Sequence, residues 1–211
     1  MTRTYLIALT AALTVSLGAR GAAQEAKMTV RPESRLTLAG SSNVHDWACR
    51  SAALTATIAL DESYATKSFT AIAKPISTVV VTVPVKSLKC GHGKMDDNMY
   101  KALKAEQYPE IKYVLSSYEV DKTKTTDEGF NAITSGELTV AGQTRVVEIP
   151  LTALRQEGGS MKGEGAVDLK ITDFGIKPPT AMLGTLKTKD AIRISFTVLL
   201  DKSAVVALSQ R

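Results

Sequence analysis

Apolar and polar side chains alternate with a period of two along most of the chain that follows residue 30. The clearest example is the segment 192–200, where isoleucine, phenylalanine, valine and leucine occupy every second position. Such alternation predicts β-strands with one face turned to a core, and it favours antiparallel sheet over the uniformly apolar strands of a parallel sheet. Eight segments show the pattern: 35–39, 54–60, 79–85, 111–120, 131–140, 146–151, 166–171 and 192–200. The sequence therefore predicts an all-β, antiparallel, eight-stranded fold.

One segment follows a helical period instead. Met95, Met99, Ala102 and Leu103 are spaced to lie on one face of a helix, with acidic residues near its start and basic residues near its end. These charges suit the helix dipole, and the proline at position 109 closes the segment. We expect one short helix here, whose apolar face either packs on the core or forms a lid within residues 90–105.

Eight strands with one apolar face each must avoid leaving two open edges, and either a closed barrel or a two-sheet sandwich does so. An eight-stranded barrel has an interior that side chains fill or that holds one small ligand. The inward positions are mainly aliphatic, and aromatic residues make up only 5% of the chain. A cavity with such walls would suit an aliphatic ligand, and a filled core fits the same pattern equally well. The candidate lining residues are Ile58, Leu60, Val79, Val81, Val83, Tyr113, Leu115, Val147, Ile149, Leu169, Ile194, Phe196 and Val198 from the strands, with Met95, Met99 and Leu103 from the helix.

Residues 1–23 have the three-part layout of a secretory signal peptide. A positive start at Arg3 precedes the uncharged run 5–18, and Gly21 and Ala23 stand at the −3 and −1 positions of a cleavage site. The run is shorter than the roughly 20 residues that cross a bilayer, and no later segment is long and apolar enough to do so. We expect cleavage after Ala23, export to the periplasm or the medium, and one mature domain over 24–211.

The net charge argues against nucleic acid as a partner. The whole chain carries a net charge of +5, but residues 1–23 contain Arg3 and Arg20 and no acidic residue, so their removal leaves +3. The remaining basic residues are interleaved with acidic ones and form no cluster of the kind that binds phosphates.

Two cysteines and two histidines are the candidates for chemistry. Cys49 and Cys90 are the only cysteines, and export to an oxidising compartment favours a disulfide between them. The alternative is a metal site, because His45 and His92 stand close by and complete a Cys₂His₂ ligand set for zinc or copper(I). The sequence has no serine-hydrolase, zinc-protease or phosphate-binding motif, so we expect no catalytic activity. Trp47, the only tryptophan, is expected to plug the core with its indole N–H hydrogen-bonded.

Four stretches and the final alternating strand resemble the YceI-like family, in that family's order and over residues 30–200. The stretches are 38–47 (LAGSSNVHDW), 99–113 (MYKALKAEQYPEIKY), 136–147 (GELTVAGQTRVV) and 168–177 (DLKITDFGIK). The resemblance implies a lipocalin-like barrel with a helix, usually periplasmic, around a long apolar cavity that holds polyisoprenoid lipids such as quinone or prenyl-phosphate chains. It therefore favours a cavity over a filled core. The chain departs from the simplest members in its segment 41–49, in its paired cysteines and in Pro178-Pro179.

The sequence thus predicts an exported protein that carries or sequesters an isoprenoid or similar aliphatic lipid, with no cofactor beyond such a lipid or quinone. One rival is a metal-handling or hydrolytic protein built around His45, Cys49, Cys90 and His92. A second rival is an envelope stress protein with a filled barrel. Whether the barrel forms a homodimer is left open.

Overall fold

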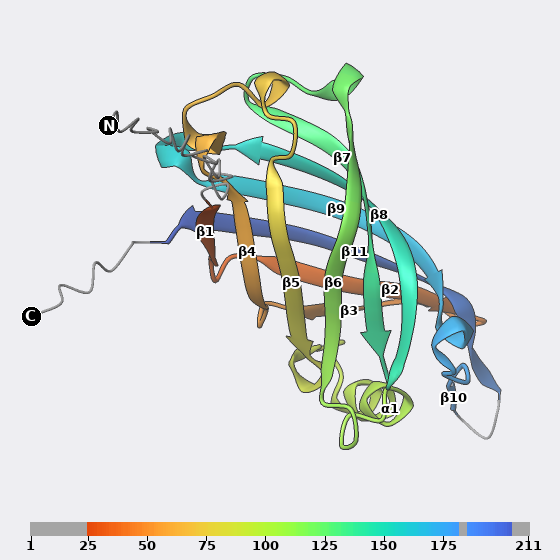
Figure 1. The fold of residues 1–211 in the computed structure, drawn as a ribbon. Helices are drawn as coiled ribbons and strands as arrows, with labels where there is room; N and C mark the ends of the chain where they lie inside the picture. The colour runs from red at the N-terminus through yellow and green to blue at the C-terminus, as the bar shows by residue number, and fades with distance from the viewer. Residues whose placement is uncertain (1–24, 182–184, 204–211) are drawn as a thin grey trace, which may run out of the picture.

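The computed structural model describes residues 25–181 and 185–203, so the predicted signal peptide lies outside the described residues. Antiparallel strands dominate the described chain, as Figure 1 shows. Their bounds are β1 Glu25–Val30, β2 Arg35–Ser42, β3 Asp46–Ser51, β4 Thr55–Asp61, β5 Ile76–Pro84, β6 Glu110–Asp121, β7 Gly129–Val140, β8 Gln143–Arg155, β9 Met161–Lys170, β10 Thr180–Ala181 and β11 Leu186–Lys202. The α-helix is α1, Gly93–Ala102, and short 3₁₀ turns are η1 Glu62–Ala65, η2 Phe69–Ala71, η3 Val85–Ser87, η4 Lys122–Lys124, η5 Glu157–Gly159 and η6 Ile171–Phe174.

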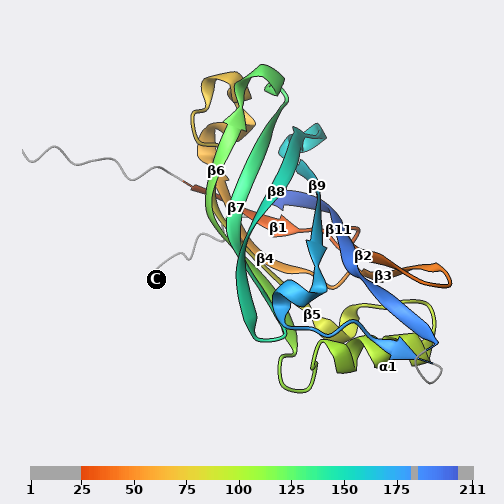
Figure 2. The same cartoon turned by 90° about the vertical axis from the view of Figure 1, so that its right-hand side faces the viewer.

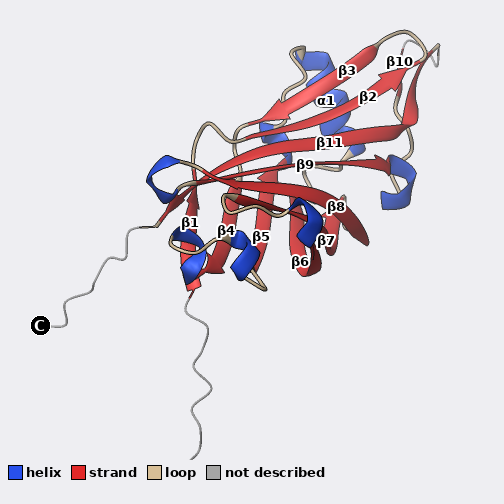
Figure 3. Cartoon of the chain, turned by 90° about the horizontal axis from the view of Figure 1, so that it is seen from above, coloured by secondary structure: helices blue, strands red, loops and turns tan. Residues whose placement is uncertain are grey.

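Eight of these strands form a closed ring, which confirms the predicted eight-stranded antiparallel barrel with one helix. The order around the ring is β1, β4, β5, β6, β7, β8, β9 and β11, and β11 then pairs with β1. Seen from above, β4 to β8 make one wall, and β9, β11, β2 and β3 make the facing wall (Figure 3). Every strand of the ring has partners on both sides for at least part of its length, so neither end of the sheet is left as an open edge strand.

The longest strand makes the closure possible. One edge of β11 pairs with β9 over Ala191–Leu200. Its other edge serves two strands in series, with β2 paired to Ile192–Thr197 and β1 paired to Leu200–Lys202. Residues 31–34 turn the chain between β1 and β2, where the Arg31 N–H donates to the Leu199 carbonyl at 2.8 Å.

Sequence periodicity missed three of the observed strands, β1, β3 and β10. β1 is short and adjoins the predicted cleavage site, although Ala26 and Met28 alternate inward in it. β3 carries Trp47 and Cys49 and has no regular apolar alternation, so we predicted no strand there. β10 has only two residues.

The helix α1 lies beneath the lower end of the barrel in Figures 1 and 2, close to its predicted position. It is held by contacts with the segment that enters it. The Cys90 N–H donates to the Asp96 carboxylate at 2.7 Å, and the Tyr100 hydroxyl lies 2.8 Å from the Leu88 carbonyl oxygen. None of the helices in the described part of the chain is long and apolar enough to cross a membrane.

A disulfide and a two-hydrogen-bond bridge join β3 to this same segment. Arg50 and Lys89 exchange both backbone hydrogen bonds, each 2.8 Å long. The neighbouring Cys49 and Cys90 form the predicted disulfide. These links close the lower rim where the β2–β3 hairpin extends past the ring, so the disulfide secures a seam between two distant parts of the sequence.

We predict that replacing both Cys49 and Cys90 with alanine lowers the free energy of unfolding by about 4 kcal/mol. The cysteines are 41 residues apart, and in the chain-entropy model the bond removes that loop-closure entropy from the unfolded state. Urea denaturation under oxidising conditions measures the change. A reductant should lower the stability of the wild type equally and leave the double variant unchanged. The prediction would be contradicted if wild type kept the same urea midpoint after reduction, with thiol titration showing that both cysteines were fully reduced.

Candidate ligand-binding cavity

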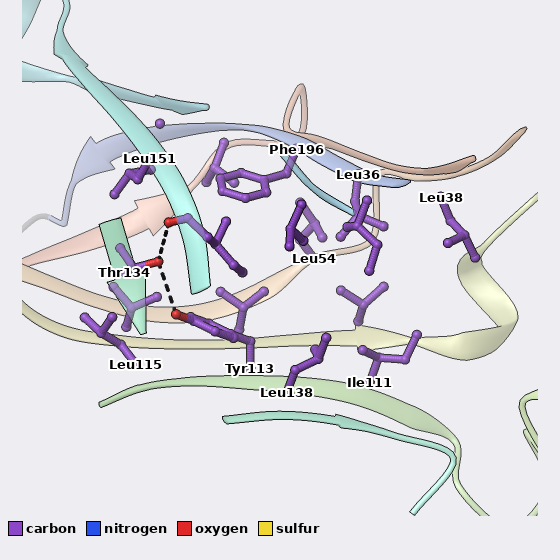
Figure 4. Close-up of a pocket in the computed structure, with 18 of the residues that line it drawn as sticks. Leu36, Leu38, Leu54, Ile111, Tyr113, Leu115, Thr134, Leu138, Leu151 and Phe196 are labelled. Atoms are coloured by element: carbon purple, nitrogen blue, oxygen red, sulfur yellow. Dashed lines mark hydrogen bonds between the residues drawn. The ribbon is translucent and has the colours of Figure 1, made fainter. Parts of the chain in front are cut away.

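The barrel encloses an apolar cavity of about 240 Å³. A single buried water needs only about 10–15 Å³ on the same measure, so the space is far larger than a packing defect. Aliphatic side chains from both walls point into it, as Figure 4 shows for Leu36, Ile111, Leu115 and Leu151. The interior of this barrel is therefore hollow, and the filled core left open by the periodicity is not what the structure contains.

Thirteen of the predicted lining residues surround this cavity. They are Ile58, Leu60, Val79, Val81, Val83, Leu103, Tyr113, Leu115, Ile149, Leu169, Ile194, Phe196 and Val198. That they contact a ligand stays a prediction.

Three residues on the predicted list are placed elsewhere. Met95 and Met99 lie on α1, outside the barrel wall, and the Met99 sulfur is 3.8 Å from the Cys90 sulfur. Val147 is buried in the lower core cluster together with lining residues such as Leu138 and Val140, but it is not itself one of the residues that line the cavity. Of the three helix-segment residues, only Leu103, just past the end of α1, reaches the cavity. Since the helix segment is tied down by the disulfide, Asp96 and Tyr100, the structure gives no support to a lid formed by residues 90–105.

Other lining residues were not on the predicted list. Leu36, Leu38, Ile111 and Leu138 belong to segments whose alternation was recognised, so the same signal would have found them. Leu54 and Ile171 also stand in recognised alternating segments, although the structure places both just outside the strands. Leu88, Phe174 and Ile176 come from turns, where no period exists to reveal an inward side chain.

Aromatic side chains close the upper end of the barrel. Tyr64, Phe69 and Phe130 are fully buried there, with the two phenyl rings 5.2 Å apart. The Arg155 guanidinium lies over the Phe69 ring at 5.0 Å and donates to the Tyr64 carbonyl oxygen at 2.6 Å. This arginine thereby fixes η1 and η2 as a cap, and the cavity ends beneath it.

The wall between β8 and β9 is interrupted at its lower half. The two strands pair only between Leu151–Arg155 and Met161–Gly165, and they diverge toward the bottom of Figure 2. Pro150 stands where the pairing stops and has no N–H to donate, as expected of a proline at the end of a ladder. The turn η6 covers the interruption, with Phe174 and Ile176 buried against the lower core.

A carboxylate on β11 holds this covering turn. Asp190 accepts hydrogen bonds from the Thr172 N–H at 3.0 Å and from the Thr172 hydroxyl at 2.8 Å. These hydrogen bonds, the backbone one first, lower the pKa of Asp190 below its usual value. The ionised form of Asp190 is therefore the form that fixes η6 over the gap.

The cavity wall is almost free of polar groups. Lys162 directs its ammonium group to Glu164 at 2.8 Å. The remaining polar side chains are those of Tyr113 and Thr134, whose oxygens are 3.3 Å apart (Figure 4). Burial raises the pKa of the Tyr113 phenol, and its hydrogen bond to Thr134 opposes that shift.

The alternative metal site is not formed. Two of its four proposed ligands, Cys49 and Cys90, are bonded to each other in the disulfide, so neither offers a thiolate to a metal. His45 lies exposed at the turn between β2 and β3, and His92 is the exposed residue before α1. Within residues 25–181 and 185–203, no three metal-binding side chains come together.

Trp47 also differs from expectation. It is half-buried on β3 and packs on Gly40 of β2, where an added Cβ would lie 2.4 Å from the indole ring. Its indole nitrogen is buried without a hydrogen-bond partner among the described residues, so the predicted partner is not found.

A closed antiparallel barrel around an apolar cavity defines the class of small β-barrels whose interior has room for one small ligand. Within that class, the model of the YceI-like domain matches residues 34–200. The chain therefore belongs to the YceI-like domain family. A comparison with curated proteins found no match.

Solved structures share the fold at low sequence identity. BcnA of Burkholderia cenocepacia is 17% identical with a TM-score of 0.64, and the alignment covers 81% of this chain and 99% of BcnA. A polyisoprenoid binding domain from Saccharophagus degradans is 12% identical with a TM-score of 0.61, covering 84% and 99%. The YceI protein of Campylobacter jejuni is 16% identical with a TM-score of 0.52, covering 96% and 100%.

We predict that Asp190→Asn loosens η6 in a pH-dependent way. The pKa of Asp190 is lowered by folding, so its contribution to stability is present above the unfolded pKa of about 4 and is lost as the pH falls through the folded value. The variant should be less stable than wild type at pH 7, with faster amide exchange at Thr172, and the difference should shrink below pH 4. Asp173→Asn, an exposed change on the same turn, is the control and should show no such convergence. A difference between wild type and Asp190→Asn that is equal at pH 7 and pH 3 would count against the role of the ionised carboxylate.

Proposed function

We propose that this protein carries or stores a polyisoprenoid or similar aliphatic lipid inside the barrel, in the periplasm or outside the cell. The observation that carries the proposal is the hollow, aliphatic interior. Burying each methylene of a lipid chain there would contribute about 0.8 kcal/mol. A polyisoprenoid is a long apolar chain of the kind that such walls favour.

The comparisons support the choice of ligand class. The Saccharophagus degradans domain, which shares the fold, is described as polyisoprenoid-binding. Membership of the YceI-like family points the same way. These likenesses concern fold and family, so the ligand of this chain is our proposal.

The chemistry of the wall supports binding over catalysis. The side chains that line the cavity in the described chain include no carboxylate, imidazole or thiol. Acid–base and nucleophilic catalysis most often use such groups. The polar side chains that are present have partners of their own, since Lys162 pairs with Glu164, Tyr113 donates to Thr134 and Thr134 donates to Ile149. We therefore propose a binding protein without catalytic activity.

The disulfide supports a location outside the cytoplasm. Structural disulfides persist in oxidising compartments such as the periplasm and the extracellular medium. We propose that residues 1–23 direct export and are then removed. Mass spectrometry of the mature protein should find an N-terminus at Gln24.

Native mass spectrometry of the full chain after export tests the lipid proposal. We expect an adduct that solvent extraction removes, with the extract containing a polyisoprenoid or another long aliphatic lipid. A metal adduct would instead favour a metal-handling role, and a bare protein would favour a structural role. Either of these two results would overturn the proposal.

We predict that Val81→Trp prevents lipid binding, whereas Val80→Trp does not. Val81 points into the cavity, and Val80 is its neighbour on the same strand but is not among the lining residues. A tryptophan at position 81 would occupy space that the lipid needs, so the native mass of the variant should lack the adduct. Circular dichroism checks that both variants keep their β-structure. Equal lipid content in the two folded variants would show that the lipid binds elsewhere.

A further inference from the structure

We propose that Tyr113 and Thr134 form a hydrogen-bond acceptor site inside the cavity that selects lipids bearing a hydroxyl group. A lipid alcohol or phenol would bind more tightly than an ether or carbonyl compound with the same chain. This inference rests on the proposed lipid-binding function and names the chemistry of the lipid's polar group.

The direction of the hydrogen bonds at this site is fixed by a backbone carbonyl. The Thr134 hydroxyl lies 2.9 Å from the Ile149 carbonyl oxygen, which can only accept. The single proton of Thr134 is therefore donated to Ile149. The Tyr113 hydroxyl, 3.3 Å from the Thr134 oxygen, must then donate its own proton to Thr134.

This chain of donation leaves the phenolic oxygen of Tyr113 with lone pairs and no proton to offer. No other hydrogen bond to this oxygen occurs within the described residues. Leu115, Leu138 and Leu151 surround the site (Figure 4). A hydroxyl that donates its proton also becomes a better acceptor. The Tyr113 oxygen is therefore suited to accept a hydrogen bond from a donor group on the ligand.

A glycine on the neighbouring strand allows this arrangement. Gly136 lies on β7, between Thr134 and Leu138 on the inward face. A Cβ atom there would lie 2.6 Å from both the ring carbon Cζ and the hydroxyl oxygen of Tyr113. Glycine in a strand interior marks a close approach of this kind. Its absence of a side chain lets the ring lie across β7 and brings the hydroxyl to Thr134.

The apolar walls around Tyr113 and Thr134 make ligand affinity depend on which polar group the lipid carries. Thr134 is only 6% exposed, and a polar ligand atom left without a partner in such apolar walls is strongly disfavoured. An alcohol or phenol can donate to Tyr113 without disturbing the existing bonds. An ether cannot donate, and a carbonyl could be satisfied only by taking the Tyr113 proton away from Thr134. The site therefore fits an isoprenoid alcohol or phenol whose hydroxyl lies within the barrel.

The test compares three probes on the delipidated full chain: geranylgeraniol, its methyl ether and the corresponding aldehyde. Wild type should bind the alcohol about three- to tenfold more tightly than the ether, the usual effect of one hydrogen bond. The double variant Tyr113→Phe/Thr134→Val should bind the two equally, whereas Tyr113→Phe alone leaves the Thr134 oxygen free to accept from the alcohol and should keep part of the preference. Tyr118→Phe removes a hydroxyl from the same strand, and this hydroxyl is bonded to the backbone of Ile76. Tyr118 is not among the lining residues, so this variant should keep the preference.

Thr134→Val alone gives a result that simple loss of packing would not produce. Without Thr134 as acceptor, the Tyr113 proton becomes available to a ligand, so the aldehyde should gain affinity relative to the alcohol. Equal binding of all three probes by wild type, or an alcohol preference that survives in the folded double variant, would overturn this site while leaving lipid binding intact. Failure of every probe to bind wild type would overturn the proposed function and this inference together.

Discussion

An apolar cavity without side chains to fill it persists only if the wall around it cannot collapse, and here backbone hydrogen bonds hold that wall. The ring of eight strands leaves no unpaired edge along its upper half, because β11 is long enough to pair with β9 on one side and with β1 and β2 in series on the other. If the two walls moved inward until their side chains filled the cavity, backbone hydrogen bonds between neighbouring strands of the ring would have to break. The hollow interior is thus a consequence of sheet closure, and every other feature of the site depends on it.

Where the pairing of strands around the barrel stops, other contacts hold the wall together, and they differ from one position to the next. The lower rim beside β3 is joined by the disulfide and by the Arg50–Lys89 bridge. The interruption between β8 and β9 is covered by η6, which Asp190 holds through Thr172. The upper end is capped by buried aromatic rings that Arg155 ties to the turn backbone. Each set of contacts joins segments that are distant in sequence, and each therefore constrains the shape of the whole barrel.

The period of two was enough to predict eight strands and most of the cavity wall, because alternation records which face of a strand avoids water. It failed where burial does not follow a period. Leu88 and Phe174 line the cavity from turns, and β3 is paired because of its hairpin with β2 and carries no alternation. The helical face at Met95 and Met99 was correctly recognised as apolar, but a period cannot say whether such a face meets a cavity or other side chains. The Tyr113–Thr134 pair was also beyond sequence reasoning, since it depends on how β6 and β7 lie side by side and on a glycine between the two side chains.

Apolar walls supply affinity in proportion to the area they bury, and that contribution hardly distinguishes one long aliphatic chain from another. Discrimination must come from the few places where a ligand can satisfy or violate a hydrogen bond. In this barrel the aliphatic lining makes the single tyrosine–threonine pair more selective, because the one other polar side chain of the described wall, Lys162, is paired with Glu164. In the function we propose, the low aromatic and high aliphatic content of the chain sets how tightly a lipid is held, and the one polar pair sets which polar group that lipid carries.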